Sequence, residues 1–108
     1  MKALKLEQLR VLFLDQQASC LVDERIHAGT ATNVEVKFRH IVGHALLVDS
    51  PVIVIAHNHP SGDPTPSKQD IDYTQRLFGI CKALDIRLHD HVIVAGNGSF
   101  SFREAGYM

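Results

Sequence analysis

The residues best suited to chemistry lie between positions 57 and 70, in the string HNHPSGDPTPSKQD. His57 and His59 follow the apolar run 52–56, which predicts a buried central strand. Side chains alternate across a strand, so both imidazoles face the same side, about 7 Å apart along it. A bend in the chain at this point would let the two imidazoles converge on one ion.

The next residues predict a stiff loop and then a helix. Three prolines and a glycine between positions 60 and 66 exclude regular structure. Ser67 then reads as the N-cap of a helix, with Asp70 at its third position. Two imidazoles, one carboxylate and room for a water form the ligand set of a catalytic zinc site. Taken singly, each residue is more often structural, but their combination in strand, loop and helix start favours the metal.

This pattern resembles the JAMM signature of MPN+ metalloproteases, which is His-x-His-Pro followed by a loop and Ser-x-x-Asp. The longer string HNHPSGDPTPS is similar to the RadC branch of that superfamily, as are VLFLD at 11–15, AGT at 28–30, DHVIV at 90–94 and SFRE at 101–104. The resemblance implies one zinc ion per chain, held by His57, His59 and Asp70. It also implies that a zinc-bound water attacks an amide, peptide or isopeptide bond.

The resemblance implies two further catalytic residues. JAMM proteins carry a glutamate general base ahead of the first long strand, and Glu7 matches that position. Glu24 and Glu35 remain open as rivals, because spacing to the histidines does not choose among the three. The family's serine, here Ser67, hydrogen-bonds the tetrahedral oxyanion. As an N-cap, Ser67 also has a structural duty that does not depend on catalysis.

A second dense cluster, His-Asp-His at 89–91, resembles part of the RadC pattern and lies at the head of a strand. We expect it to be hydrogen-bonded in the core or to support a ligating histidine. RadC-like chains usually carry Pro-Arg-Glu at the head of the first helix, whereas this chain has Phe-Arg-His at 38–40. Three other histidines match no motif and read as ordinary surface or interface residues: His27, His40 and His44.

The surrounding elements predict an α/β domain with the order β-β-α-β-α-β-β, a mixed sheet with helices packed on it. We expect strands at 9–15, 19–28, 52–56, 86–95 and 99–102, the first two as a hairpin and the first buried on both faces. The resemblance implies the MPN fold, similar in architecture to the cytidine deaminases. Helices are expected within 32–49 and at 67–84, the first starting either at the capping box 32–35 or a few residues later. Their predicted apolar stripes are Phe38, Ile41, Val42, Ala45 and Leu46, and Ile71, Leu77, Phe78, Cys81 and Leu84.

Composition narrows the classes of partner. The 108 residues are expected to form a single domain, and eleven Lys and Arg against twelve Asp and Glu give a net charge of −1. We therefore expect weak or no binding to duplex DNA, especially without the helix-hairpin-helix region of longer RadC members. No apolar run approaches a membrane span and no signal pattern is visible, so a cytoplasmic location is expected. Cys20 and Cys81 read as free, buried thiols rather than a disulfide.

Two functions compete on these residues. The first is a zinc-dependent hydrolase with an unknown peptide or protein substrate. The second is a non-catalytic metal-binding module associated with DNA repair or recombination; either leaves a homo-oligomer open. An HNH nuclease is excluded because its named residues are scattered over a hairpin and a helix. A nucleobase deaminase would need His-x-Glu and Pro-Cys-x-x-Cys, and neither is present.

Overall fold

The computed structural model describes residues 8–27 and 37–108. The elements are β1 (Gln8–Leu14), β2 (Cys20–His27), α1 (Phe38–Leu47), β3 (Val52–Asn58), α2 (Lys68–Ala83), β4 (Arg87–Ala95) and β5 (Gly98–Ser101). This order confirms the predicted α/β fold class. Glu7 and Glu35 lie outside the described residues, and so does the possible helix start at 32–35.

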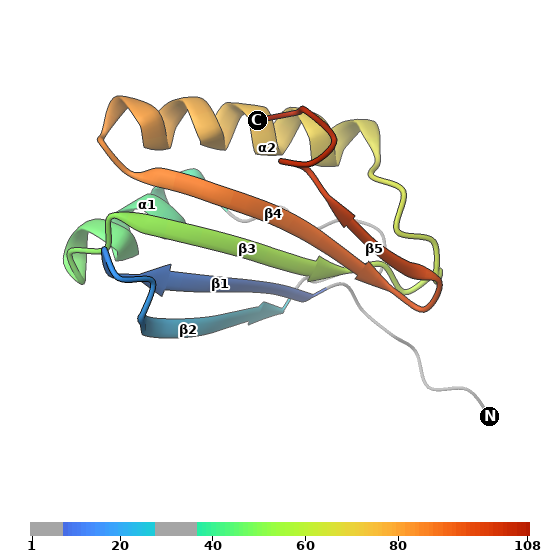
Figure 1. Ribbon diagram of the computed structural model, residues 1–108, viewed down its shortest axis with the longest axis horizontal. Helices are drawn as coiled ribbons and strands as arrows, with labels where there is room; N and C mark the ends of the chain where they lie inside the picture. Colours follow the sequence, from blue (N-terminus) through green and yellow to red (C-terminus); the bar gives the residue numbers. More distant parts are fainter. Residues whose placement is uncertain (1–7, 28–36) are drawn as a thin grey trace.

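The five strands form one mixed sheet in the order β2-β1-β3-β4-β5, with β3 at its centre (Figure 1). β1 runs antiparallel to both β2 and β3, and β5 runs antiparallel to β4. β3 and β4 are parallel, and α2 makes the crossover between them. The parallel pair places the carboxyl end of β3 beside the start of α2, where the histidines lie.

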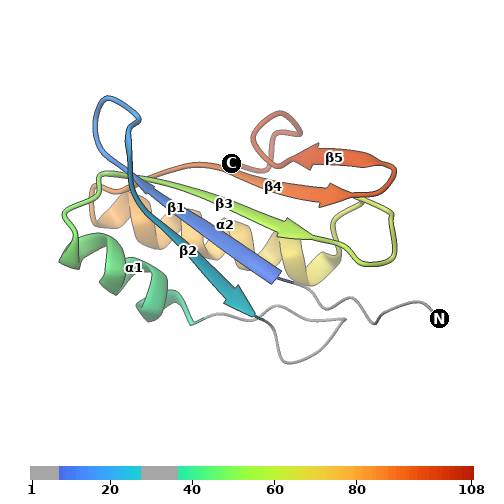
Figure 2. The same ribbon diagram turned by 90° about the horizontal axis from the view of Figure 1, so that it is seen from below.

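Both helices pack on the same face of the sheet, so the domain has two layers (Figure 2). The core is built from alternate residues of β1 and β3, which point toward the helices: Leu9, Val11, Phe13, Ile53 and Ile55. The two helices also touch, because the rings of Phe38 and Tyr73 lie 4.8 Å apart. On the other face Leu12 and Leu14 are only half-buried. The expectation that the first strand is buried on both faces was therefore wrong.

The helical stripes were predicted too broadly. Ile41, Val42 and Ala45 of α1 are buried, as are Leu77 and Cys81 of α2. Leu46 and Leu84 are instead 58% and 46% exposed. Cys20 is also exposed, which corrects the prediction that both thiols are buried. Neither described helix is long and apolar enough to cross a membrane.

The starts of the two helices differ in their capping. The N-cap of α1 is Lys37, whose side chain makes no capping hydrogen bond, so this helix begins at the later of the two predicted positions. The N-cap of α2 is Ser67, and its capping box with Asp70 is complete. The helix that carries a predicted metal ligand is therefore the one whose first turn is fixed by side chains.

Candidate metal centre

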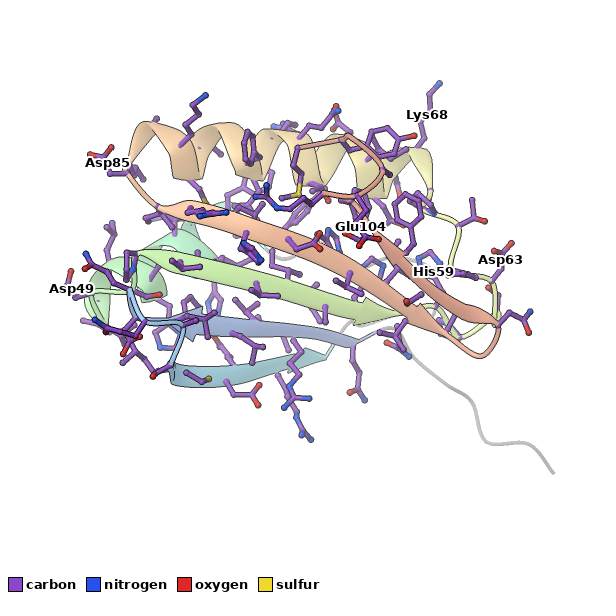
Figure 3. The ribbon with its side chains drawn as sticks, viewed as in Figure 1. Asp49, His59, Asp63, Lys68, Asp85 and Glu104 are labelled. Atoms are coloured by element: carbon purple, nitrogen blue, oxygen red, sulfur yellow. The ribbon has the colours of Figure 1, made fainter. Side chains whose placement is uncertain are left out.

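The three predicted ligands come together where β3 ends and α2 begins. His57 is the penultimate residue of β3, and the backbone N–H of His59 donates to the carbonyl of Val94 on β4 at 3.0 Å. Figure 3 labels His59 beside Asp63, at the end of the sheet opposite Asp49 and Asp85. The site therefore lies at one end of the sheet, outside the carboxyl ends of the central parallel strands β3 and β4.

The ligand atoms converge at distances that suit a small cation. His59 Nε2 lies 3.1 Å from Asp70 Oδ2, and His57 Nε2 lies 3.7 Å from Asp70 Oδ1. One ligand atom from each of the three side chains lies within 4.8 Å of the others. A tetrahedral zinc ion with bonds of about 2.0–2.1 Å separates its ligand atoms by about 3.3 Å. Only small side-chain movements separate the observed arrangement from this one.

The protonation of His59 follows from its partners. Its Nδ1 lies 2.9 Å from the carbonyl oxygen of Asp63, and a carbonyl can only accept, so Nδ1 carries the proton. In a neutral imidazole, Nε2 is then an acceptor that faces the carboxylate oxygen of Asp70. Two acceptors at this distance repel unless a cation, either a proton or a metal ion, lies between them.

The loop that carries Asp63 is held from both sides. Asp63 Oδ1 accepts from the backbone N–H of Thr65 at 3.0 Å and from its hydroxyl at 2.7 Å, which lowers the pKa of Asp63. Gly62 adopts φ 90°, a conformation that favours glycine, and its carbonyl accepts from the N–H of Asn97 at 3.0 Å. The carbonyl that orients His59 is therefore fixed in place before any ion binds.

Asp70 is positioned by the capping box of α2. Its Oδ2 accepts from the backbone N–H of Ser67 at 2.9 Å, and Ser67 Oγ accepts from the backbone N–H of Asp70 at 3.0 Å. The prediction that Ser67 caps this helix is confirmed. Because Ser67 Oγ accepts in the cap, its hydroxyl proton is left to donate elsewhere.

His57 presents a buried, unpartnered nitrogen to the site. Its Nδ1 lies 2.7 Å from Nε2 of His91, while its Nε2 has no hydrogen-bond partner within the described part of the chain. Burial, the largest cause, lowers the pKa of His57 to about 4. The charge of Asp70 opposes this shift, whereas His59 adds to it. His57 is therefore a neutral imidazole, the state in which histidine binds metals.

His91 continues the contacts of His57 into the core. It is 2% exposed, its ring stacks on Phe102 with centroids 4.5 Å apart, and its Nδ1 lies 2.6 Å from Oγ1 of Thr74. The expectation that the 89–91 cluster is hydrogen-bonded in the core is confirmed for His91, and its partner there is the candidate ligand His57. Sequence reasoning missed Thr74, although its position one helical turn after Asp70 could have indicated it.

The arrangement of these three side chains fits a zinc ion. His57 Nε2 is buried without a hydrogen-bond partner among the described residues, and His59 Nε2 faces a carboxylate oxygen to which a neutral ring protonated on Nδ1 cannot donate. Two imidazoles and one carboxylate are also a ligand set that zinc prefers, and three protein ligands leave a position open. The three residues therefore fit the metal that the sequence pattern predicts.

Glu24 lies in a different cluster. It sits on β2, where it pairs with Val11 of β1, and its two oxygens contact His40 Nε2 at 2.9 Å and His44 Nδ1 at 2.8 Å. His40 and His44, which were predicted to be ordinary surface or interface residues, thus join α1 to the sheet through Glu24. Burial raises the pKa of Glu24, but the hydrogen bonds from His44 and His40 outweigh it and hold this pKa below its usual value.

The chain belongs to the family of RadC-like JAB domains, whose family model matches residues 1–107. Among its relatives is UPF0758 protein YkfG of Escherichia coli, 43% identical over all 108 residues, and the match covers 68% of that protein. UPF0758 protein YeeS of the same organism is also 43% identical over 108 residues, which cover 73% of its length. UPF0758 protein SPO0054 of Ruegeria pomeroyi is 43% identical over 102 residues, and the chain spans only 46% of it.

Proposed function

We propose that this domain is a zinc-dependent hydrolase that cleaves an amide bond in a peptide, or an isopeptide bond. The observation that carries the proposal is the convergence of His57, His59 and Asp70, where the buried Nε2 of His57 has no hydrogen-bond partner in the part of the chain that the structure describes. Membership of a JAB family supports the same class of chemistry. These three residues would hold the ion, which when bound would supply a Lewis acid for a carbonyl and lower the pKa of a water.

The other groups act on protons and on the developing charge. Ser67 keeps its hydroxyl proton, because its oxygen serves the cap as an acceptor, and it can donate this proton to an oxyanion. We assign the general base to Glu7. This assignment rests on the resemblance to the JAMM pattern, in which the glutamate precedes the first long strand, as Glu7 does here. Its carboxylate would accept a proton and pass it to the leaving amine.

Metal content is the first test. The purified protein should bind one zinc per chain, measured by elemental analysis after zinc addition and gel filtration. Asp70→Asn should lose the ion while keeping the helix cap, since the amide oxygen can still accept from the N–H of Ser67. A parent chain that binds no zinc, or an Asp70→Asn variant that binds it as well as the parent, would refute the site.

Turnover is the second test, with the zinc-loaded chain screened against peptide and isopeptide libraries. Glu7→Gln should keep zinc and fold but lose about 100- to 10,000-fold in rate, the usual contribution of general acid–base catalysis. Glu24→Gln is the matched control. Glu24 is hydrogen-bonded to His40 and His44 of α1, so this variant should leave the rate unchanged. If the large loss appears at Glu24 instead, the base assignment is wrong. If the loaded parent cleaves nothing, the domain is a metal-binding module.

A further inference from the structure

A single chain of hydrogen bonds joins the backbone of Asp70 to the imidazole of His57. Thr74 Oγ1 lies 2.7 Å from the carbonyl oxygen of Asp70 and 2.6 Å from Nδ1 of His91. Nε2 of His91 lies 2.7 Å from Nδ1 of His57. All three side chains are buried, with exposures of 1% for Thr74, 2% for His91 and 4% for His57. Water therefore cannot replace a missing partner in this chain at low cost.

The position of every proton in this series of hydrogen bonds follows from the hydrogen bond between Thr74 and the carbonyl of Asp70. A carbonyl can only accept, so the Thr74 hydroxyl gives its one proton to Asp70. Oγ1 must then accept from His91, which places the proton of His91 on Nδ1. Nε2 of a neutral His91 is consequently an acceptor, and Nδ1 of His57 must carry the proton that it accepts. The lone pair of His57 is thereby left on Nε2, the atom that faces Asp70.

The two metal-ligating histidines differ in how securely their protons are placed. His59 donates to the carbonyl of Asp63, an acceptor that cannot reverse its role. His57 donates to another imidazole, which can donate as readily as it accepts. Nothing in His91 itself decides between these roles. The decision lies with Thr74, whose hydroxyl is in turn committed to the backbone of the helix.

We propose that Thr74, acting through His91, is a positioning residue that keeps the proton of His57 on Nδ1 and so reserves Nε2 for the metal. Without the hydroxyl, Nδ1–H of His91 would be buried without an acceptor. His91 then gains by carrying its proton on Nε2 and donating it to Nδ1 of His57, whose own proton moves to Nε2. Each imidazole keeps one proton, but the ligand atom of His57 is blocked. Metal binding would have to reverse both changes.

The test replaces Thr74 by Val, which has nearly the same shape and no hydroxyl, with Thr74→Ser as the control that keeps it. Zinc affinity, measured by competition with a chelating dye, should fall by about 10- to 100-fold in Thr74→Val, the usual effect of removing a partner of a ligand. It should stay within about twofold of the parent in Thr74→Ser. Thermal unfolding of both variants checks that the fold is kept.

Nitrogen-15 NMR of the metal-free protein gives a readout that does not depend on zinc or on activity. In the parent, both His57 and His91 should be protonated on Nδ1, and in Thr74→Val both should be protonated on Nε2. A parent with Nε2–H on His57 overturns the proposal whether or not the variant folds. So does a folded Thr74→Val variant that keeps Nδ1–H. The measurement of zinc affinity rests on the proposed function, but the NMR measurement does not. If the parent protein binds no zinc, the NMR result alone decides the proposal.

Discussion

Acid should destabilise the metal-free protein, because two histidines are buried in their neutral form. His57 and His91 are 4% and 2% exposed. Burial, the largest cause for each, lowers the pKa of His57 from 6.5 to about 4 and lowers the pKa of His91 well below its ordinary value. In the unfolded chain both side chains are hydrated and take up a proton near their ordinary pKa.

The sign and size of the effect follow from proton binding. Between about pH 6.5 and pH 4 the unfolded chain holds more protons than the folded one, so the free energy of unfolding falls as the pH falls. Each unit of pKa difference is worth about 1.36 kcal/mol, so His57 alone removes about 3 kcal/mol across this range. About 2 kcal/mol of this is already lost at about pH 5. His91 adds to the loss in the same direction.

The measurement is urea denaturation in the presence of a chelator, repeated at several pH values between about 7.5 and 5. His57→Asn is the control, because its amide nitrogen can still donate to His91 but does not titrate. This variant should lose about 2 kcal/mol less than the parent on going to about pH 5. A parent whose free energy of unfolding stays constant or increases over this range would refute the reasoning.

Two further substitutions test the cap of α2 and the cluster on β2. Ser67→Ala removes the side-chain acceptor for the N–H of Asp70, so urea denaturation should show a loss of about 1 kcal/mol, and an unchanged midpoint would contradict the cap's contribution. Glu24→Gln removes the charge that His40 and His44 share and should cost about 1 kcal/mol near neutral pH without changing zinc content. Because the pKa of Glu24 is lowered, the stability that its carboxylate contributes should decrease as the pH falls below the ordinary pKa of a carboxyl group. A stability difference between parent and variant that increases below that pH would contradict this prediction.

The candidate ligands could be predicted from sequence because the structure that positions them is local. His57, His59 and Asp70 lie within fourteen residues, and strand alternation, a proline-rich loop and a capping box already indicate from this stretch alone that they lie together. The errors lie elsewhere. Periodicity could not indicate that Leu12 faces away from both described helices, since that depends on both of them packing on one face of the sheet.

The sequence indicated a supporting role for the 89–91 cluster, but it could not indicate that His91 is the residue that contacts His57, because this depends on the register of β4. Ile53 pairs with Leu88, but Val54 pairs with Asp90, so His89 is an extra residue in the ladder. Such a bulge moves every later side chain of the strand to the other face. With strict alternation after Leu88, His91 would point away from the helices. No periodicity in the sequence reveals one inserted residue.

The same bulge explains what the strings DHVIV and SFRE do in this fold. One oxygen of Asp90 accepts from the backbone N–H groups of His91 and Arg103 at 2.7 and 3.1 Å, and the other accepts from the hydroxyl of Ser101 at 2.6 Å. The guanidinium of Arg103 donates to the carbonyl of His89, the extra residue itself. These contacts satisfy the polar groups that a break in the ladder leaves unpaired. Residues far from the ligands in sequence thus hold the bulge that turns His91 toward His57.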